Sequence, residues 1–495
     1  MTTSNSIKVA TVLMGRGVNA LIGLLFVPYL SRALPLADYG TYGQTLMATD
    51  FFKFLFAIGL AKIIMVYYAN HENEQNFIFG SNLAAAIVSG TLASLGMILF
   101  APFIASAIEN PELTHYLKLF GFSILVSIVF DTLNATLIYF DKIKESVYAI
   151  VLGNMAKIAL LLIAIQVYQS MDFVFYGLLI AISFQAILAA FFIPKELFKN
   201  ISVKSAYFTK QIKEGIPLGL SAIAAIMMIT VDGFMVSKLL SVEAYAIYRN
   251  GSIQIPFLAS VYTAISMIIL PVLARLFSKN ENQEIATLKK RVISNTAAIL
   301  YPPLLFVLFF HQPLIETYLS SKYAESAIVF CVYNLIMLFQ IHHFQEIPII
   351  AGKTKFIFLS FAIGFLVNLI LNLLLIPQIG VLGGAIGTVA ATATVIVMLS
   401  HKTLNILNVG ITDFFDLKKI FTVLLLTSAI MSLFYFIYPI QYGILPLLFI
   451  GGFVVVLCYL LLLKIGILEK RIVEQLLVKV PVIGNRLVGF VNQFS

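Results

Sequence analysis

The stretch Ser31–Tyr42, SRALPLADYGTY, returns later in the chain as Ser237–Tyr248, SKLLSVEAYAIY. Serine, leucine and two tyrosines occupy the same places in both copies, and an arginine in the first copy is matched by a lysine in the second. Each copy closes a long apolar segment, the first and the seventh along the chain. A membrane protein that contains two copies of one helical bundle is typically a transporter whose site lies where the copies meet. The repeat therefore predicts a two-lobed transporter.

The composition requires a lipid environment. The chain has 495 residues, of which 60% are hydrophobic and only 11% are charged, whereas soluble domains carry roughly 25% charged residues. This amount of apolar surface cannot be hidden from water by folding alone, so lipid is the expected solvent. The predicted fold class is an all-α polytopic membrane protein.

Apolar runs that are long enough to cross a bilayer, about 20 helical residues, occur fourteen times. The predicted spans are 9–31, 42–68, 78–101, 116–140, 146–168, 173–193, 215–236, 250–274, 292–311, 326–350, 356–376, 381–400, 418–438 and 443–463. An even number of spans puts both termini on one side of the membrane. The number of spans between the two copies is also even, so the halves should share one orientation, as in a parallel repeat.

The lysine and arginine residues of the loops predict on which side of the membrane the two termini lie. Most of the 32 lysine and arginine residues fall on the side of the N-terminus, among them Lys289, Lys290 and Arg291 before span nine. Loops rich in lysine and arginine stay in the cytoplasm, so both termini are expected there. These loops also explain the net charge of +9, and no nucleic-acid partner is expected.

The repeat and the spans divide the chain into five parts. We expect an N-lobe at 1–193 (spans one to six), a cytoplasmic inter-lobe linker at 194–214, a C-lobe at 215–405 (spans seven to twelve), spans thirteen and fourteen at 406–463, and a basic amphipathic cytoplasmic tail at 464–495. The last two spans lie outside the repeat and are interpreted as an addition to it. An amphipathic basic tail is expected to lie on the cytoplasmic leaflet.

Several ionisable side chains lie inside the spans of the first half and at the start of span eight. Such a group costs roughly 2.5–3.5 kcal/mol at a helix centre on insertion scales, so function is its default explanation. Arg16 lies in span one, and Asp50 and Lys53 share one face of span two, three residues apart. Arg249 opens span eight. If these groups line one cavity, its net charge is positive, and phosphate is the natural ligand of arginine and lysine.

Structural interpretations of the same charges stay open. Asp50 and Lys53 could form a self-neutralising pair. Lys62 in span two and Lys157 in span five could extend along their helices to the membrane interface, and we favour that interpretation over contact with cargo for these two lysines.

The second half carries a different polar set. Asp232 lies in span seven, Asn368 and Asn372 share a face of span eleven at i and i+4, and Thr388 lies in span twelve. A carboxylate with amide and hydroxyl oxygens could bind Na⁺ through hard oxygen ligands or could take up a proton. The alternative is that the asparagines form hydrogen bonds between helices.

No pattern in the chain points to catalysis. There is no Walker motif, so ATP is not the direct energy source, and no nucleophile stands with a matching base. His311, His342, His343 and Glu346 gather around spans nine and ten, where a hydrogen-bonded set is favoured over a metal site. We expect a transporter and not an enzyme, with no cofactor apart from Na⁺ or H⁺ as a coupling ion.

Four stretches carry a resemblance to a known superfamily. They are LSRALPLADYGTYGQ at 30–44, AYAIYRNGSIQIPF at 244–257, ILPVLARL at 269–276 and GVLGGAIGT at 380–388. In these motifs the chain resembles the MOP exporter superfamily and, within it, the Wzx-type polysaccharide flippases, over residues 1–410. The superfamily also contains the lipid II flippases and the MATE drug exporters.

This resemblance implies two six-helix lobes around a V-shaped cavity, alternating access, and an oligosaccharide on undecaprenyl diphosphate as cargo. The implied setting is the bacterial inner membrane, with a surface polysaccharide such as the O-antigen of lipopolysaccharide as the product. Membrane lipid and the polysaccharide polymerase machinery are the implied partners. The resemblance makes Arg16, Lys53 and Arg249, with Asp50 beside them, the expected diphosphate contacts.

The superfamily leaves two alternatives open. In lipid II flippases, which move a peptidoglycan precursor, the positions matching Asp232, Asn368, Asn372 and Thr388 bind sodium, but this chain offers a single carboxylate there. Such a flippase would also be expected to carry more arginines in its cavity. A MATE-type exporter, which couples a cation to small-molecule export, would need carboxylates in the N-lobe, where span one has Arg16 and no acid.

Overall fold

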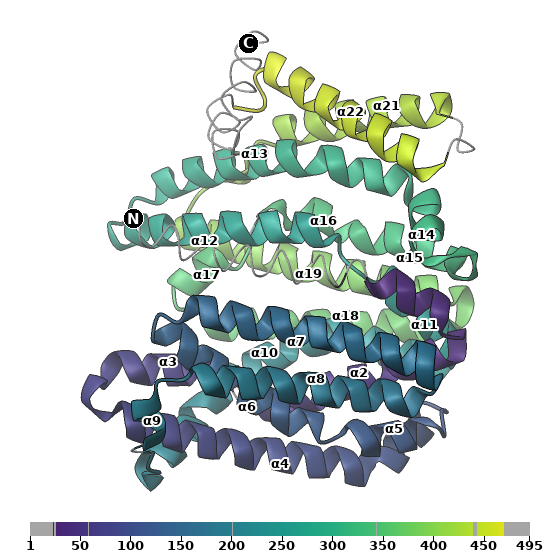
Figure 1. Ribbon diagram of the computed structural model, residues 1–495. Helices are drawn as coiled ribbons and strands as arrows, with labels where there is room; N and C mark the ends of the chain where they lie inside the picture. Colours follow the sequence, from purple (N-terminus) through teal and green to yellow (C-terminus); the bar gives the residue numbers. More distant parts are fainter. Residues whose placement is uncertain are drawn as a thin grey trace. The chain divides into compact units, whose positions relative to one another are not determined.

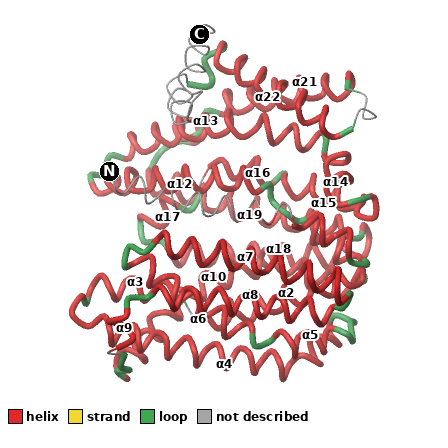
Figure 2. Tube along the Cα trace, viewed as in Figure 1, coloured by secondary structure: helices red, strands yellow, loops and turns green. Residues whose placement is uncertain are grey.

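The computed structural model describes residues 26–57, 59–199, 201–342, 344–438 and 443–469, together with Gly23. Within these residues every regular element is a helix and no strand occurs (Figure 1 and Figure 2). In this part of the chain, 11 helical segments are long and apolar enough to cross a membrane. The predicted all-α polytopic membrane fold is confirmed.

The chain forms two compact units. Unit 1 contains Met1–Arg249 and Ile376–Val381, and unit 2 contains Asn250–Leu375 and Leu382–Ser495. These units are defined by contacts, whereas the predicted lobes are defined by the repeat. The lobe boundaries therefore stay a prediction.

Unit 1 is a bundle in which α4, α6, α8 and α7 are successive neighbours and α10 packs against α2, α3 and α4 (Figure 1). Its elements are α2 (Leu36–Ala57), α3 (Leu60–Asn70), η1 (Glu72–Glu74), α4 (Gln75–Ala107), α5 (Leu113–Phe120), α6 (Ser123–Tyr139), α7 (Ile143–Ile163), η2 (Ala164–Tyr168), α8 (Met171–Phe192), α9 (Lys195–Lys199), α10 (Ser205–Leu239) and most of α11 (Val242–Gly251). On α4 the small residues Ala86 and Ala93 are fully buried, while Leu99 and Phe103 are 76% and 72% exposed. Small residues between helices and large apolar residues outside are typical of a bundle in lipid.

Unit 2 is organised around α13, which packs against α12, α20, α21 and α22. Its elements are α12 (Pro256–Ser278), α13 (Asn282–Phe309), α14 (His311–Leu319), η3 (Ser321–Tyr323), α15 (Ala324–Asn334), α16 (Ile336–Phe339), η4 (Gln340–His342), α17 (Glu346–Ile350), α18 (Thr354–Ile379), α19 (Val381–Leu407), α20 (Ile411–Phe414), α21 (Leu417–Ile437) and α22 (Ile444–Lys464). The side chains that α13 buries include Tyr301, whose hydroxyl donates to the carbonyl of Leu338 at 2.8 Å.

Each predicted span after the first coincides with helix, but several are broken. Most of span one lies outside the described residues. Its described end, from residue 26 on, belongs to a helical stretch that runs to residue 33. Span two is split between α2 and α3 at Gly59, whose φ of 65° suits a residue without a side chain. Span eight is split into α11 and α12, because Pro256 opens α12 and the residue before a proline is driven out of the helical conformation.

The two copies of the repeated motif have the same local structure. Residues 31–33 are helical, 34 and 35 are not, and α2 begins at Leu36. In the second copy residues 237–239 are helical, 240 and 241 are not, and α11 begins at Val242. The alignment read from the sequence pairs Leu36 with Val242, so the repeat holds at the level of single residues.

The end of the linker segment is attached to unit 1. Lys204 Nζ lies 2.8 Å from Glu74 Oε1, and this hydrogen bond lowers the pKa of the Glu74 carboxyl. Further along, the buried Asn82 donates from Nδ2 to Gln211 Oε1 at 2.6 Å. The start of α10 is therefore a fixed part of unit 1 and not a free tether.

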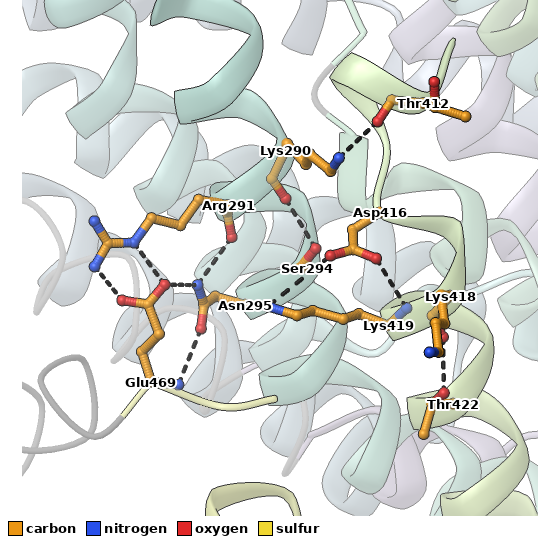
Figure 3. Close-up of polar contacts among 10 residues, drawn as sticks. All are labelled: Lys290, Arg291, Ser294, Asn295, Thr412, Asp416, Lys418, Lys419, Thr422 and Glu469. Carbon is orange, nitrogen blue, oxygen red and sulfur yellow. Dashed lines mark hydrogen bonds and ion pairs between the residues drawn. The ribbon is translucent and has the colours of Figure 1, made fainter. Parts of the chain in front are cut away.

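The start of the C-terminal tail is attached to α13 (Figure 3). Glu469, the last described residue, is paired with Arg291. Its backbone N–H donates to Asn295 Oδ1 at 3.3 Å, and Asn295 Nδ2 donates to Glu469 Oε1 at 3.1 Å. The hydrogen bond from Arg291 lowers the pKa of the Glu469 carboxyl.

Candidate functional site

A group of charged side chains lies on the packed helices α2 and α6 of unit 1. Lys53 Nζ, on α2, is 2.9 Å from Asp131 Oδ2, on α6. The Lys53 side chain is 23% exposed and that of Asp131 is 37% exposed. This ion pair therefore joins two helices and is only partly buried.

Asp50 connects this pair to two more cations. It lies one turn before Lys53 on α2, is exposed, and interacts electrostatically with Lys53, Arg249 and Lys157. We call Asp50, Lys53, Asp131, Lys157 and Arg249 the charge cluster. Three cations face two carboxylates in it, so the cluster carries an excess of positive charge.

Arg249 is held in place by the backbone of α2. Its Nη1 donates to the carbonyl oxygen of Gly43 at 3.1 Å, and the hydroxyl of Tyr245 donates to the same oxygen at 3.2 Å. The guanidinium carbon lies 5.8 Å from the centre of the Tyr42 ring, in the range of a cation–π contact. A methyl group at Gly43 would lie 2.7 Å from Arg249 Cδ and 2.8 Å from Tyr245 Cε1. Only glycine at this position leaves room for the arginine.

Gly43 and Arg249 directly follow the two copies of the motif, and the alignment that pairs Leu36 with Val242 also pairs these two residues. They are in direct contact. This contact thus joins the residues that directly follow the two motif copies.

The predicted diphosphate contacts are partly brought together. Asp50, Lys53 and Arg249 belong to one cluster, whereas Arg16 lies outside the described residues. Lys53 forms its ion pair with Asp131 and not with Asp50, so the interpretation of a self-neutralising Asp50–Lys53 pair does not describe this lysine.

Two members of the charge cluster were not assigned to it from the sequence. Asp131 lies inside span four and would have been found by the same search for ionisable residues within spans. Lys157 was expected to extend toward the membrane interface. It is instead only partly exposed and interacts with Asp50 and Arg249.

Asp232, predicted to bind an ion, is buried in α10 of unit 1. Its Oδ2 accepts a hydrogen bond from the hydroxyl of Tyr248, and its Oδ1 accepts one from the backbone N–H of Gly233 at 3.0 Å. Tyr248 is the last residue of the second motif copy, so the carboxylate is tied to the repeat.

The other predicted ion ligands lie in unit 2. Asn368, Asn372 and Thr388 are all fully buried. The oxygens of both asparagines face Gly387 of α19, where an added methyl group would lie 2.8 Å from Asn368 Oδ1 and would overlap Asn372 Oδ1. Neither Oδ1 nor Nδ2 of Asn372 has a hydrogen-bond partner among the described residues. Because Asp232 belongs to unit 1, a common ion site for the four residues stays a prediction.

A second ion pair lies in unit 2, where the sequence suggested a histidine-centred set. Lys289 Nζ is 2.7 Å from Glu346 Oε2 and donates to the carbonyl oxygen of His342 at 2.8 Å. Ser266 donates to Glu346 Oε1 at 2.6 Å. Lys289, expected in a cytoplasmic loop, is fully buried within α13. Among the described residues no three His, Cys, Asp or Glu side chains form a set that could hold a metal ion.

Comparisons with known proteins identify relatives of the chain. Residues 29–328, more than half of it, match the family described as polysaccharide biosynthesis protein. The chain is 22% identical over 403 residues to the uncharacterized membrane protein MJ1068 of Methanocaldococcus jannaschii, which covers 73% of this chain and 78% of that protein.

Two solved structures share the fold. The lipid II flippase MurJ in an inward closed conformation superposes with a TM-score of 0.72 at 15% identity, over 93% of this chain and 98% of that one. An inward-facing multidrug resistance MATE transporter of the MOP superfamily superposes with a TM-score of 0.65 at 12% identity, over 79% and 94% of the two chains. At such low identity these matches show a common fold.

Proposed function

Since the chain belongs to the polysaccharide biosynthesis protein family, we propose that it flips an undecaprenyl-diphosphate-linked oligosaccharide from the cytoplasmic to the outer leaflet. The protein acts by alternating access in the bacterial inner membrane, with both termini in the cytoplasm. It serves the assembly of a surface polysaccharide, works as a transporter and not as an enzyme, and delivers its cargo to the polymerase machinery.

The observation that carries this proposal is the excess of cations in the charge cluster. Lys53, Lys157 and Arg249 lie on three helices and stand against Asp50 and Asp131. Cations within membrane helices mark the path of an anionic cargo. Arginine and lysine suit phosphate, arginine through its paired donors and lysine as a point charge.

The direction of transport has an electrostatic basis. Moving one elementary charge across the membrane potential changes its free energy by about 2.3 kcal/mol per 100 mV. A doubly charged diphosphate that leaves a negative cytoplasm thus gains roughly 4–5 kcal/mol at 100 mV. The charge cluster holds the headgroup while the prenyl chain stays in lipid.

Coupling to Na⁺ or H⁺ is part of the proposal. Asp232, Asn368, Asn372 and Thr388 are the candidate residues, since oxygen atoms of this kind suit Na⁺. The buried amide of Asn372, which lacks a partner among the described residues, supports this assignment. An ion bound by these residues would supply positive charge that drives the return of the empty transporter. Asp232→Asn should make transport independent of ion gradients.

The test is a lipid extract of a deletion strain, read by mass spectrometry. The deletion should accumulate undecaprenyl-diphosphate oligosaccharide and lose surface glycan. The unaltered gene and Lys118→Ala, an exposed lysine on α5, should restore export. Arg249→Ala and Lys53→Ala should not, at equal protein level. Full export by Arg249→Ala would refute the assigned cargo contact.

The same experiment tests a second candidate, which the high structural similarity to a lipid II flippase favours. If the cargo is lipid II, the deletion strain should accumulate the disaccharide-pentapeptide intermediate and lyse. Loss of surface glycan without lysis would exclude that candidate.

A further inference from the structure

We infer that Asp131 is a displaceable counter-ion that makes the charge cluster selective for multiply charged headgroups. In the structure it is paired with Lys53, and we infer that a diphosphate takes its place when cargo binds. This inference rests on the proposed function, because it concerns the same site.

The geometry of the pair suits displacement. Lys53 Nζ and Asp131 Oδ2 are 2.9 Å apart, yet both side chains are partly exposed. Because neither side chain is fully buried, another anion can reach Lys53 and replace the carboxylate without leaving a buried charge uncompensated. The two partners come from different helices, α2 and α6. Opening the pair therefore leaves Lys53 on a helix that also carries Asp50 and faces Arg249.

The charges explain the selectivity. While Asp131 stays on Lys53, the cations of the cluster exceed its carboxylates by a single charge. An anion that displaces Asp131 must offer Lys53 more than the carboxylate already does. A diphosphate, with at least two negative charges, meets this condition. A singly charged phosphodiester, the headgroup linkage of ordinary membrane phospholipids, does not.

Rejection of bulk phospholipid is a physical requirement for any transporter of a rare lipid. Specificity is a difference of affinities, and natural sites often obtain it from a repulsive element directed at the wrong ligand. Asp131 is such an element, because its negative charge repels every phosphate group and competes with it for Lys53. Only a headgroup with at least two negative charges attracts Lys53 strongly enough to displace Asp131. It acts through Lys53 and is a specificity-determining residue.

The experiment measures binding of farnesyl diphosphate to the purified protein in nanodiscs of phosphatidylcholine or of the phosphodiester anion phosphatidylglycerol. Asp131→Asn should bind this probe about tenfold more tightly in phosphatidylcholine, or about 1.4 kcal/mol. It should also lose at least threefold in affinity when phosphatidylglycerol replaces phosphatidylcholine, whereas the unaltered protein should lose less than twofold.

Matched controls separate charge from structure. Asp172→Asn removes the same charge from an exposed pair of unit 1, with His115 at 2.8 Å, and should leave both values unchanged. Asp131→Glu keeps the charge and should keep the selectivity. In a Lys53→Ala background the gain from Asp131→Asn should vanish. If Asp131→Asn is not monodisperse, Asp131→Ser carries the same expectation.

The outcomes distinguish this inference from the proposed function. Unaltered or weaker binding by a folded Asp131→Asn protein, or unchanged selectivity, would overturn the role of Asp131 while leaving the flippase proposal intact. If the unaltered protein binds farnesyl diphosphate no better than farnesol, the proposed function fails, and the inference fails with it.

Discussion

The two units each contain a lysine–carboxylate pair of nearly the same length in very different surroundings. In unit 1 Lys53 and Asp131 are 2.9 Å apart and partly exposed. In unit 2 Lys289 and Glu346 are 2.7 Å apart, and their side chains are only 1% and 5% exposed. The buried pair has further hydrogen bonds to Ser266 and to the carbonyl of His342.

Burial, and not distance, separates the roles of these pairs. Two charges away from water lose their hydration, and removal of one partner leaves the other charge uncompensated. Lys289 and Glu346 are therefore bound to each other and fix α13 against α17. The unit 1 pair is only partly buried, so another group can reach it and the lysine can exchange partners.

The largest effect is expected from Lys289→Met. Methionine fills a similar volume but leaves Glu346 buried without its cation, which should lower the free energy of unfolding by about 3–5 kcal/mol. Chemical unfolding in mixed micelles, followed by circular dichroism, measures this change. The double variant Lys289→Met/Glu346→Leu should recover most of the loss, because no buried charge remains. A single variant with less than about 1 kcal/mol of destabilisation would remove the distinction between the pairs.

Gly43→Ala extends the comparison to a contact in which shape matters more than charge. The added methyl group would press on Arg249 and Tyr245 at the distances given above, which should destabilise unit 1 by about 1–3 kcal/mol and reduce export at least tenfold. Gly452→Ala is the matched control, because nothing lies within 4 Å of a methyl group there. It should be neutral or stabilising, as alanine favours helix by about 1 kcal/mol over glycine. Equal effects at both glycines would contradict the close fit at Arg249.

A smaller effect on stability is expected from Asp131→Asn. Exposed ion pairs contribute about 0.2–1 kcal/mol, so the same unfolding measurement should detect a change no larger than this. The ligand-binding change proposed above should exceed the stability change. A loss similar to that of Lys289→Met would show that the unit 1 pair is structural.

The smallest effect is expected at Glu469. Its pKa is lowered in the folded protein by Arg291, so the pair stabilises above the pKa of the unfolded carboxyl, about 4.3, and this contribution is lost as the pH falls through the lower folded-state value. Because Arg291 is 56% exposed, screening limits the contribution to a few tenths of a kcal/mol. Glu469→Gln should match the unaltered protein at acidic pH and be slightly less stable at pH 7. A difference that persists at acidic pH would contradict the ion-pair origin.

The positions of the helices were largely predictable, since apolar run length depends only on neighbouring residues. The predicted boundaries missed the break of span eight between Gly251 and Pro256, although the proline itself indicates it. Span two was predicted as one helix because hydropathy does not report the left-handed backbone of Gly59.

The candidate site was predictable in its residue types but not in its pairs. An ionisable residue in a span is visible in any sequence, and Asp50, Lys53 and Arg249 were found this way. Their partners were not, because Asp131 approaches Lys53 only through the packing of α6 on α2. The prediction for Lys289 was wrong in another way, because this lysine was expected in a cytoplasmic loop before span nine and is fully buried.

Apolar runs sufficed to predict a membrane protein built of helical spans, because bilayer thickness and helix geometry act on local sequence. The contact of Gly43 with Arg249, the partner of Lys53 and the burial of Lys289 required the folded chain. Each depends on side chains from distant segments that meet only after the helices pack, and the energy of a charge depends on what surrounds it there.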